Sequence, residues 1–119
     1  VFPTRFGGSL IMSTVTDQTF TVFVDDNFHY QEIDKRWVAG EFSSYDEAIV
    51  ECKRIVELSL QDGLSQKGPM TADELYSYYT DFGDDPFVRP GPTDDTRFSA
   101  WGYAKEHCKI LCPSTPTVE

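Results

Sequence analysis

The residues between 44 and 63 constrain the fold most, because their apolar side chains recur with the period of an α-helix. Ser44 and Glu47 stand three residues apart in a capping-box pattern, and Gly63 is a natural helix end. One face of this helix collects small and branched side chains: Ala48, Ile49, Cys52, Ile55, Val56 and Ser59. An amphipathic helix of about five turns must bury that face against another element, so the remaining chain has to supply a packing partner.

Two segments before this helix have the composition of β-strands. Residues 20–24 are all β-branched or aromatic, and they end at the turn-forming run 25–27. Residues 36–42 form the second segment, and no tight-turn signal separates it from the first. The sequence therefore predicts a wide antiparallel hairpin.

Two more helices and a short strand follow. Thr71 and Glu74 form a second capping box, and Gly83 ends the helix that they open. Residues 87–88 can form a short strand, and Ser99 begins a third helix. The order β-β-α-α-(β)-α predicts an α+β fold, with a small antiparallel sheet of two to three strands packed against three helices. The side chains that we expect in the core are Trp37, Phe42, Ile49, Cys52, Ile55, Val56, Leu75, Tyr79, Phe82, Trp101, Ala104 and Cys108.

The two ends of the chain differ from the part between them. Residues 1–11 show no periodicity, and Met12 then opens a polar run, so we expect 1–11 to be an upstream or vector-derived extension. A chain of 119 residues has room for one domain. We predict a single α+β domain over 12–112 and a frayed tail over 113–119.

The charge of the chain argues against several classes of partner. Lys and Arg number 10, whereas Asp and Glu number 20, which gives a net charge of -10. Such a surface repels phosphate backbones and anionic lipids, so we expect no nucleic acid and no membrane among the partners. The three cysteines, an odd number without an export signal, favour a cytoplasmic location with reduced thiols.

The sequence lacks the motifs of known catalytic sites. It contains no Gly-rich phosphate loop, no nucleophile elbow, no paired-histidine zinc motif and no CxxC. Cys52 and Cys108 fall on apolar helix faces, where a small core side chain is a simpler interpretation than a nucleophile. We therefore expect no cofactor and no enzymatic activity.

Polar side chains gather where the first predicted strand ends. Asp25, Asp26, Asn27 and His29 offer the oxygen and imidazole donors that cations use. The spacing is not that of an EF-hand, because the required glycine is missing. A solvated turn, in which Asp and Asn cap backbone amides, is the alternative interpretation.

A second acidic turn follows the second predicted helix. Asp84 and Asp85 lie just beyond Gly83, where the helix dipole disfavours negative charge. A nearby cation or a basic side chain would offset this cost. The candidate basic partners within the chain are Arg89, Arg97, Lys35 and Arg36. We predict that any function resides in these two acidic turns, and a structural ion pair is the competing interpretation.

The second predicted helix also carries more aromatic side chains than one face can bury. Tyr76, Tyr78 and Tyr79 cannot all point into the core, so we expect at least one of them, Tyr76, to be partly exposed. A tyrosine on an acidic surface can anchor a partner protein. A half-buried ring with a solvated hydroxyl is the alternative.

Several segments resemble a small family of uncharacterised bacterial proteins. The segments are VDDNFHY (24–30), GEF (40–42), the helical stretch 48–56, MTADELY (70–76), FGDDPF (82–87) and FSAW (98–101). The resemblance covers roughly residues 20 to 112. It implies no activity, because that family has no assigned activity.

We therefore predict a protein-interaction or accessory domain that is a monomer or a weak homodimer. In a first alternative, the turn from Asp25 to His29 binds a small ligand or a divalent cation. In a second, the acidic surface is a decoy that occupies the nucleic-acid-binding site of another protein. An enzyme assembled from scattered carboxylates is a further alternative.

Overall fold

The computed structural model describes residues 18–29, 32–92 and 96–113. The extension predicted over 1–11, the predicted start at Met12 and residues 114–119 of the predicted tail lie outside the described residues. Among the described residues, no helix is both long and apolar enough to cross a membrane.

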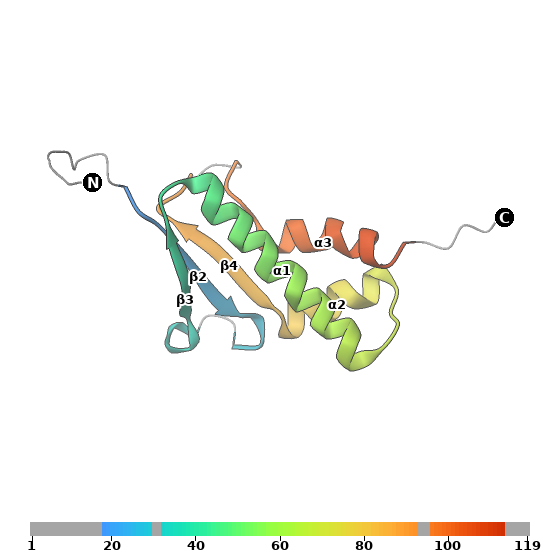
Figure 1. Ribbon diagram of the computed structural model, residues 1–119. Helices are drawn as coiled ribbons and strands as arrows, with labels where there is room; N and C mark the ends of the chain where they lie inside the picture. Colours follow the sequence, from blue (N-terminus) through green and yellow to red (C-terminus); the bar gives the residue numbers. More distant parts are fainter. Residues whose placement is uncertain (1–17, 30–31, 93–95, 114–119) are drawn as a thin grey trace, which may run out of the picture.

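Within the described residues, three antiparallel strands form one sheet in the order β3-β2-β4 (Figure 1). β2 covers Phe20–Asp26, β3 covers Trp37–Phe42 and β4 covers Asp84–Arg89. Two 3-10 turns, η3 (Asn27–His29) and η4 (Ile33–Lys35), lie between β2 and β3 along the chain. The wide hairpin is confirmed. β4 is longer than the two-residue strand that we predicted, because it pairs with β2 along its whole length.

Three helices complete the fold of the described residues. α1 covers Tyr45–Lys67, α2 covers Ala72–Phe82 and α3 covers Ala100–Leu111. Each begins at a side chain that accepts a hydrogen bond from a first-turn amide. These N-cap residues are Ser44, Thr71 and Ser99. The predicted α+β fold class, with the order β-β-α-α-β-α, is confirmed.

The first helix runs past Gly63, where we predicted its end. Gly63 is buried inside α1, and a Cβ on it would lie 3.0 Å from the ring of Tyr78 and 3.5 Å from Leu75. The glycine therefore allows α1 and α2 to approach closely and does not stop the helix. α1 ends instead at Gly68, whose positive φ of 86° is readily adopted only by glycine.

The core consists of two clusters that share α1. Figure 1 shows α1 crossing one face of the sheet, with α2 and α3 beside its C-terminal half. The sheet cluster contains Val22, Val24, Ala48, Cys52 and Ile55. The helical cluster contains Val56, Leu60, Leu75, Tyr79, Ala100, Ala104 and Cys108. The amphipathic helix α1 is therefore the element against which both halves of the molecule pack.

Most of the predicted core is buried, but two large aromatic side chains are not. Trp37 is 48% exposed and Phe82 is 51% exposed, so their assignment to the core was wrong. Trp37 is the first residue of the edge strand β3, and Phe82 is the last residue of α2. Helical or strand period assigns a face, but it does not show that a neighbouring element extends far enough to cover it. Phe42, Ile49 and Trp101 are half-buried.

Candidate functional site

The strand register brings the two predicted acidic turns together. Asp25 lies opposite Asp85, and Asp26 lies opposite Asp84, in the antiparallel pair β2–β4. Like charges at directly opposed positions of a sheet destabilise it unless neighbouring groups compensate. Whether this end of the sheet can bind a ligand therefore depends on which groups pair with each carboxylate.

Asp25 is neutralised within the chain. The Arg36 Nε donates to Asp25 Oδ1 at 2.6 Å, and its Nη2 donates to Oδ2 at 3.1 Å. Of the basic partners proposed from the sequence, Arg36 is the one that forms this ion pair. In the described ranges, neither Arg89 nor Arg97 forms an ion pair with Asp25 or Asp85.

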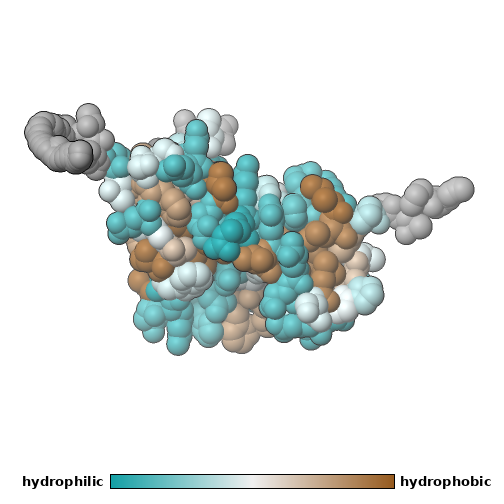
Figure 2. All heavy atoms as spheres, viewed as in Figure 1, coloured by the Kyte–Doolittle hydropathy of each residue, from teal (hydrophilic) through white to brown (hydrophobic). Residues whose placement is uncertain are grey.

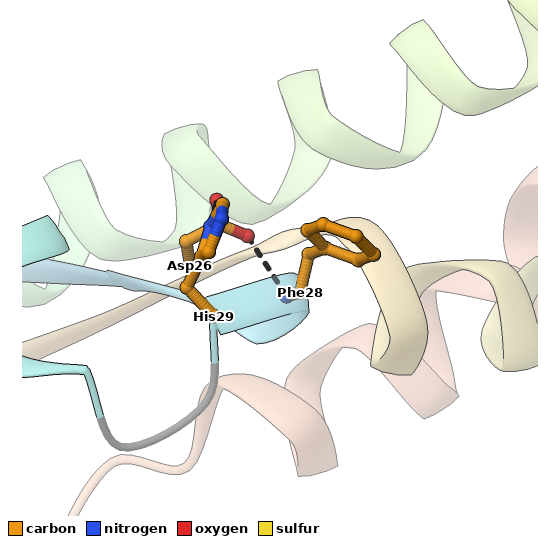
Figure 3. Close-up of polar contacts among 3 residues, drawn as sticks. All are labelled: Asp26, Phe28 and His29. Carbon is orange, nitrogen blue, oxygen red and sulfur yellow. Dashed lines mark hydrogen bonds and ion pairs between the residues drawn. The ribbon is translucent and has the colours of Figure 1, made fainter.

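Asp26 and His29 form a local contact at the end of β2. Asp26 Oδ2 lies 2.8 Å from His29 Nδ1, and its Oδ1 accepts a hydrogen bond of 2.8 Å from the Phe28 amide. Figure 3 shows the Asp26 and His29 side chains facing each other, whereas the Phe28 ring points away from them. This is the capped turn that the sequence offered as the alternative to a cation site.

Asn27 holds the fold together and does not face solvent. It is buried, its Nδ2 donates to the Tyr79 carbonyl at 2.9 Å, and its Oδ1 accepts from the Trp101 indole at 3.2 Å. Its backbone amide also donates to the Gly83 carbonyl at 2.9 Å. Asn27 thus joins the end of β2 to α2 and α3, and its side chain is not available to a ligand.

Asp84 and Asp85 are half-buried, and both carboxyls have a raised pKa. Burial raises the pKa of Asp85 to about 6, and the charge of Asp25 adds to the effect. Burial also raises the pKa of Asp84, with further contributions from Asp26 and Asp62. A positive charge bound beside Asp84 would therefore be stabilised more strongly than one bound beside an isolated surface carboxylate.

The donor atoms do not converge on a metal position. Among residues 18–29, 32–92 and 96–113, no group of three or more His, Cys, Asp or Glu side chains could hold a metal ion. Asp25 is bonded to Arg36, and Asn27 is bonded to α2 and α3. The arrangement therefore lends no support to the cation alternative.

The thiols match the role expected for small core side chains. Cys52 and Cys108 are fully buried. Burial raises the pKa of the Cys52 thiol to about 12 and that of the Cys108 thiol to about 11. A thiol of this kind supplies almost no thiolate near neutral pH and is a poor nucleophile.

Tyr76 is half-buried and packs against the helical cluster. Tyr76 is therefore partly exposed, as predicted, with α3 lying against α2. Among the described residues, the most exposed aromatic side chains are Phe28, Trp37 and Phe82.

A continuous apolar surface lies beside the two acidic turns. Phe28 is 62% exposed and stacks on Phe82 with ring centroids 5.5 Å apart. Phe82 also lines a hollow together with Trp37 and Leu58, which is 50% exposed. We call these four residues, Phe28, Trp37, Leu58 and Phe82, the aromatic surface. Figure 2 shows brown hydrophobic residues interrupting the teal surface on the face that it draws.

The rim of the aromatic surface is acidic. Asp62 and Asp84 line the same hollow as Phe82, and Asp26 is close enough to raise the pKa of Asp84. Arg54 also lines this hollow, but its guanidinium is bonded to Glu51 one turn earlier on α1. The uncompensated charge around the aromatic surface is therefore negative.

A sequence signal for this surface existed in part. α2 carries Tyr76, Tyr78 and Tyr79, which cannot all face the core, so some aromatic exposure on this helix was expected. The sequence could not show that Phe28, from the end of β2, would stack on the exposed ring.

Comparison with known proteins found no match for this chain. No protein-family model, no curated protein and no solved structure matches the chain. The resemblance to a family of uncharacterised bacterial proteins therefore stays a prediction.

Proposed function

We propose that this chain is a protein-interaction domain without catalytic activity, and that its partner docks on the aromatic surface. The exposure of four adjacent large apolar side chains carries this proposal, because isolated surface apolar residues are common but contiguous ones mark interaction sites. Aromatic residues are also among the side chains that contribute most to binding energy at protein interfaces.

The charge at the rim indicates the chemistry of the partner. Asp26, Asp62 and Asp84 surround the aromatic surface, and the whole chain has a net charge of -10. A complementary segment would place an apolar anchor on Phe82 and Lys or Arg beside Asp84. We therefore infer that the partner is a protein segment that is both apolar and basic.

A displayed library of random peptides tests this inference even though the partner is unidentified. We expect the purified chain to enrich peptides that combine aromatic or aliphatic residues with Lys or Arg. Phe82→Ser should weaken their binding by about 30-fold or more, as expected when an interface anchor is removed. Because Phe82 is half exposed, the variant should keep its fold, which circular dichroism checks.

Ile110→Ser is the matched control, because Ile110 is 69% exposed on α3 and lies outside the aromatic surface. This variant should bind the enriched peptides as the parent does. Enrichment of acidic peptides, or no enrichment at all, would overturn the proposal. Salt-sensitive binding that survives Phe82→Ser would also overturn it and would favour the acidic-decoy alternative, since a decoy needs charge but not the rings.

A further inference from the structure

The side chains of β2 that point away from α1 belong to a different kind of surface. Val22 and Val24 face α1 and are fully buried, so Thr21, Phe23 and Asp25 lie on the opposite face. A hollow of about 1120 Å³ lies on this open face and is also lined by residues of β4 and by the segment that follows it. Its lining includes Tyr45, Asp85, Phe87, Arg36, Arg89 and Arg97.

This hollow concentrates positive charge in an acidic chain. Three of the five arginines in the sequence line it, together with two aspartates. Arg36 and Asp25 neutralise each other. Arg89 and Arg97 form no ion pair within the described part of the chain, so their guanidinium N–H groups can bind an anion, although Arg89 also packs on the ring of Phe87.

Aromatic rings form part of the lining of the hollow. The rings of Phe23 and Phe87 stack with centroids 5.6 Å apart and an interplanar angle of 23°. The guanidinium carbons of Arg36 and Arg89 both lie 4.9 Å from the centroid of the Phe87 ring. These guanidinium groups already pack on Phe87, so a flat ligand group can lie beside Phe23 and against the guanidinium plane of Arg36 while an attached anion reaches Arg89 and Arg97.

We propose that this hollow binds a small organic anion in which a phosphate or a carboxylate is attached to a flat ring. Arg89 and Arg97 contact the anionic group, and Phe23 and the guanidinium plane of Arg36 contact the ring. The hydroxyls of Thr21 and Tyr45 line the same hollow and supply further hydrogen-bonding groups. This site is separate from the aromatic surface, with which it shares no residue.

The overall charge of -10 does not prevent such binding. At physiological ionic strength, charges more than about 8 Å away are largely screened, so a small ligand responds mainly to the groups that line the hollow. A long polyanion would extend beyond the hollow onto the acidic surface and be repelled. The site is therefore selective for small anions.

Nuclear magnetic resonance titration with defined probes tests the proposal. AMP carries a ring and a phosphate, and 4-hydroxybenzoate carries a ring and a carboxylate. Adenosine and inorganic phosphate each lack one of the two parts. We expect at least one of the first two probes to shift the amides of Phe23, Phe87 and Arg89 with saturation. The second pair should bind at least about 10-fold more weakly.

Three substitutions show whether the arginines are responsible. Arg89→Gln and Arg97→Gln should each weaken binding of the responding probe by about 10-fold, because each removes a charge-assisted hydrogen bond. Arg54→Gln is the matched control, since Arg54 is bonded to Glu51 on α1 and lies outside this hollow, and it should leave binding unchanged.

Several results would overturn the proposal. One is that neither AMP nor 4-hydroxybenzoate saturates below about 10 mM. Another is that adenosine or phosphate binds as tightly as the combined molecule. A third is that Arg89→Gln and Arg97→Gln both bind like the parent. A response to AMP alone assigns a phosphate ligand, and a response to 4-hydroxybenzoate alone assigns a carboxylate. Phe82→Ser should not affect any of these titrations, so this site and the proposed partner surface are tested independently.

Discussion

The two faces of β2 carry alternate residues of one strand, yet they have opposite properties. On the covered face, Val22 and Val24 pack against α1 and have no exposed surface. On the open face, Phe23 and Asp25 are half-buried and lie among charged side chains. The covered face contributes stability through apolar burial, whereas the open face keeps its rings and charges accessible to a ligand. Substitutions on the two faces should therefore have different effects on stability, although the substituted residues are neighbours along the chain.

A charge on the covered face should have the greatest effect on stability. Val24→Asp would bury an unpaired carboxylate against α1, which should cost about 3–5 kcal/mol of unfolding free energy. Most of the stability of a domain of this size would then be lost. Thr21→Asp, on the open face beside Arg89, should cost less than about 1 kcal/mol. Urea denaturation measures both. Equal costs for the two variants would show that the faces are not distinguished in this way.

Asn27 lies just beyond the end of β2 and is buried against α2 and α3. Its replacement should have the second-largest effect on stability. Asn27→Ala leaves the Trp101 indole and the Tyr79 carbonyl without their partner, at a cost of about 2–3 kcal/mol. Asp26→Ala, next to it but half-exposed, should cost about 0.5–1 kcal/mol. Thermal denaturation compares the two variants. An Asn27→Ala protein as stable as Asp26→Ala would mean that the buried hydrogen bonds contribute little.

Asp85 on the open face should make stability depend on pH in an unusual direction. Its folded pKa of about 6 exceeds the ordinary value of 3.8, so its favourable contribution to folding is complete below about pH 4 and is lost as pH rises through 6. Asp25, which is bonded to Arg36, is the charged group that raises this pKa further, while Cys52 and Tyr79 lie near Asp85, and Arg89 and Arg97 line the same hollow. Asp85→Asn should therefore gain about 1–2 kcal/mol at pH 7 and nothing at pH 4. Denaturation at the two pH values measures this, and a gain that is the same at both would contradict it.

The ion pair on the open face, between Arg36 and Asp25, should contribute least to stability. Arg36→Gln removes the partner of Asp25 and should cost about 0.5–1 kcal/mol, less in high salt. Arg54→Gln, which breaks a more exposed pair on α1, should cost less than Arg36→Gln. Urea denaturation at low and at high salt tests both. A cost for Arg36→Gln that does not change with salt would show that packing on Phe87, and not charge, holds this side chain.

Local patterns were enough to predict the elements and most of the core. The capping box at Thr71 and Glu74 is present in full, and the apolar period of α1 correctly placed Cys52, Ile55 and Val56 inside. These features depend on residues three or four positions apart, which the helix itself brings together.

Local sequence patterns predicted the candidate site less completely than the fold. The sequence placed function in the acidic turns, and the register does bring Asp25 beside Asp85. It did not identify the stack of Phe28 on Phe82 or the arginine-lined hollow. Both join side chains from elements that lie far apart along the chain, and no local spacing encodes such a contact.

Residue order alone thus established which segments are helix or strand, which face of each is apolar, and that the chain is strongly acidic. It took the packing of the elements in space to establish that Arg36 is the partner of Asp25, that Gly63 serves close packing, and that Phe82 reaches solvent. The physical reason is that periodicity acts within one element, whereas exposure and charge pairing depend on where neighbouring elements begin, end and cross.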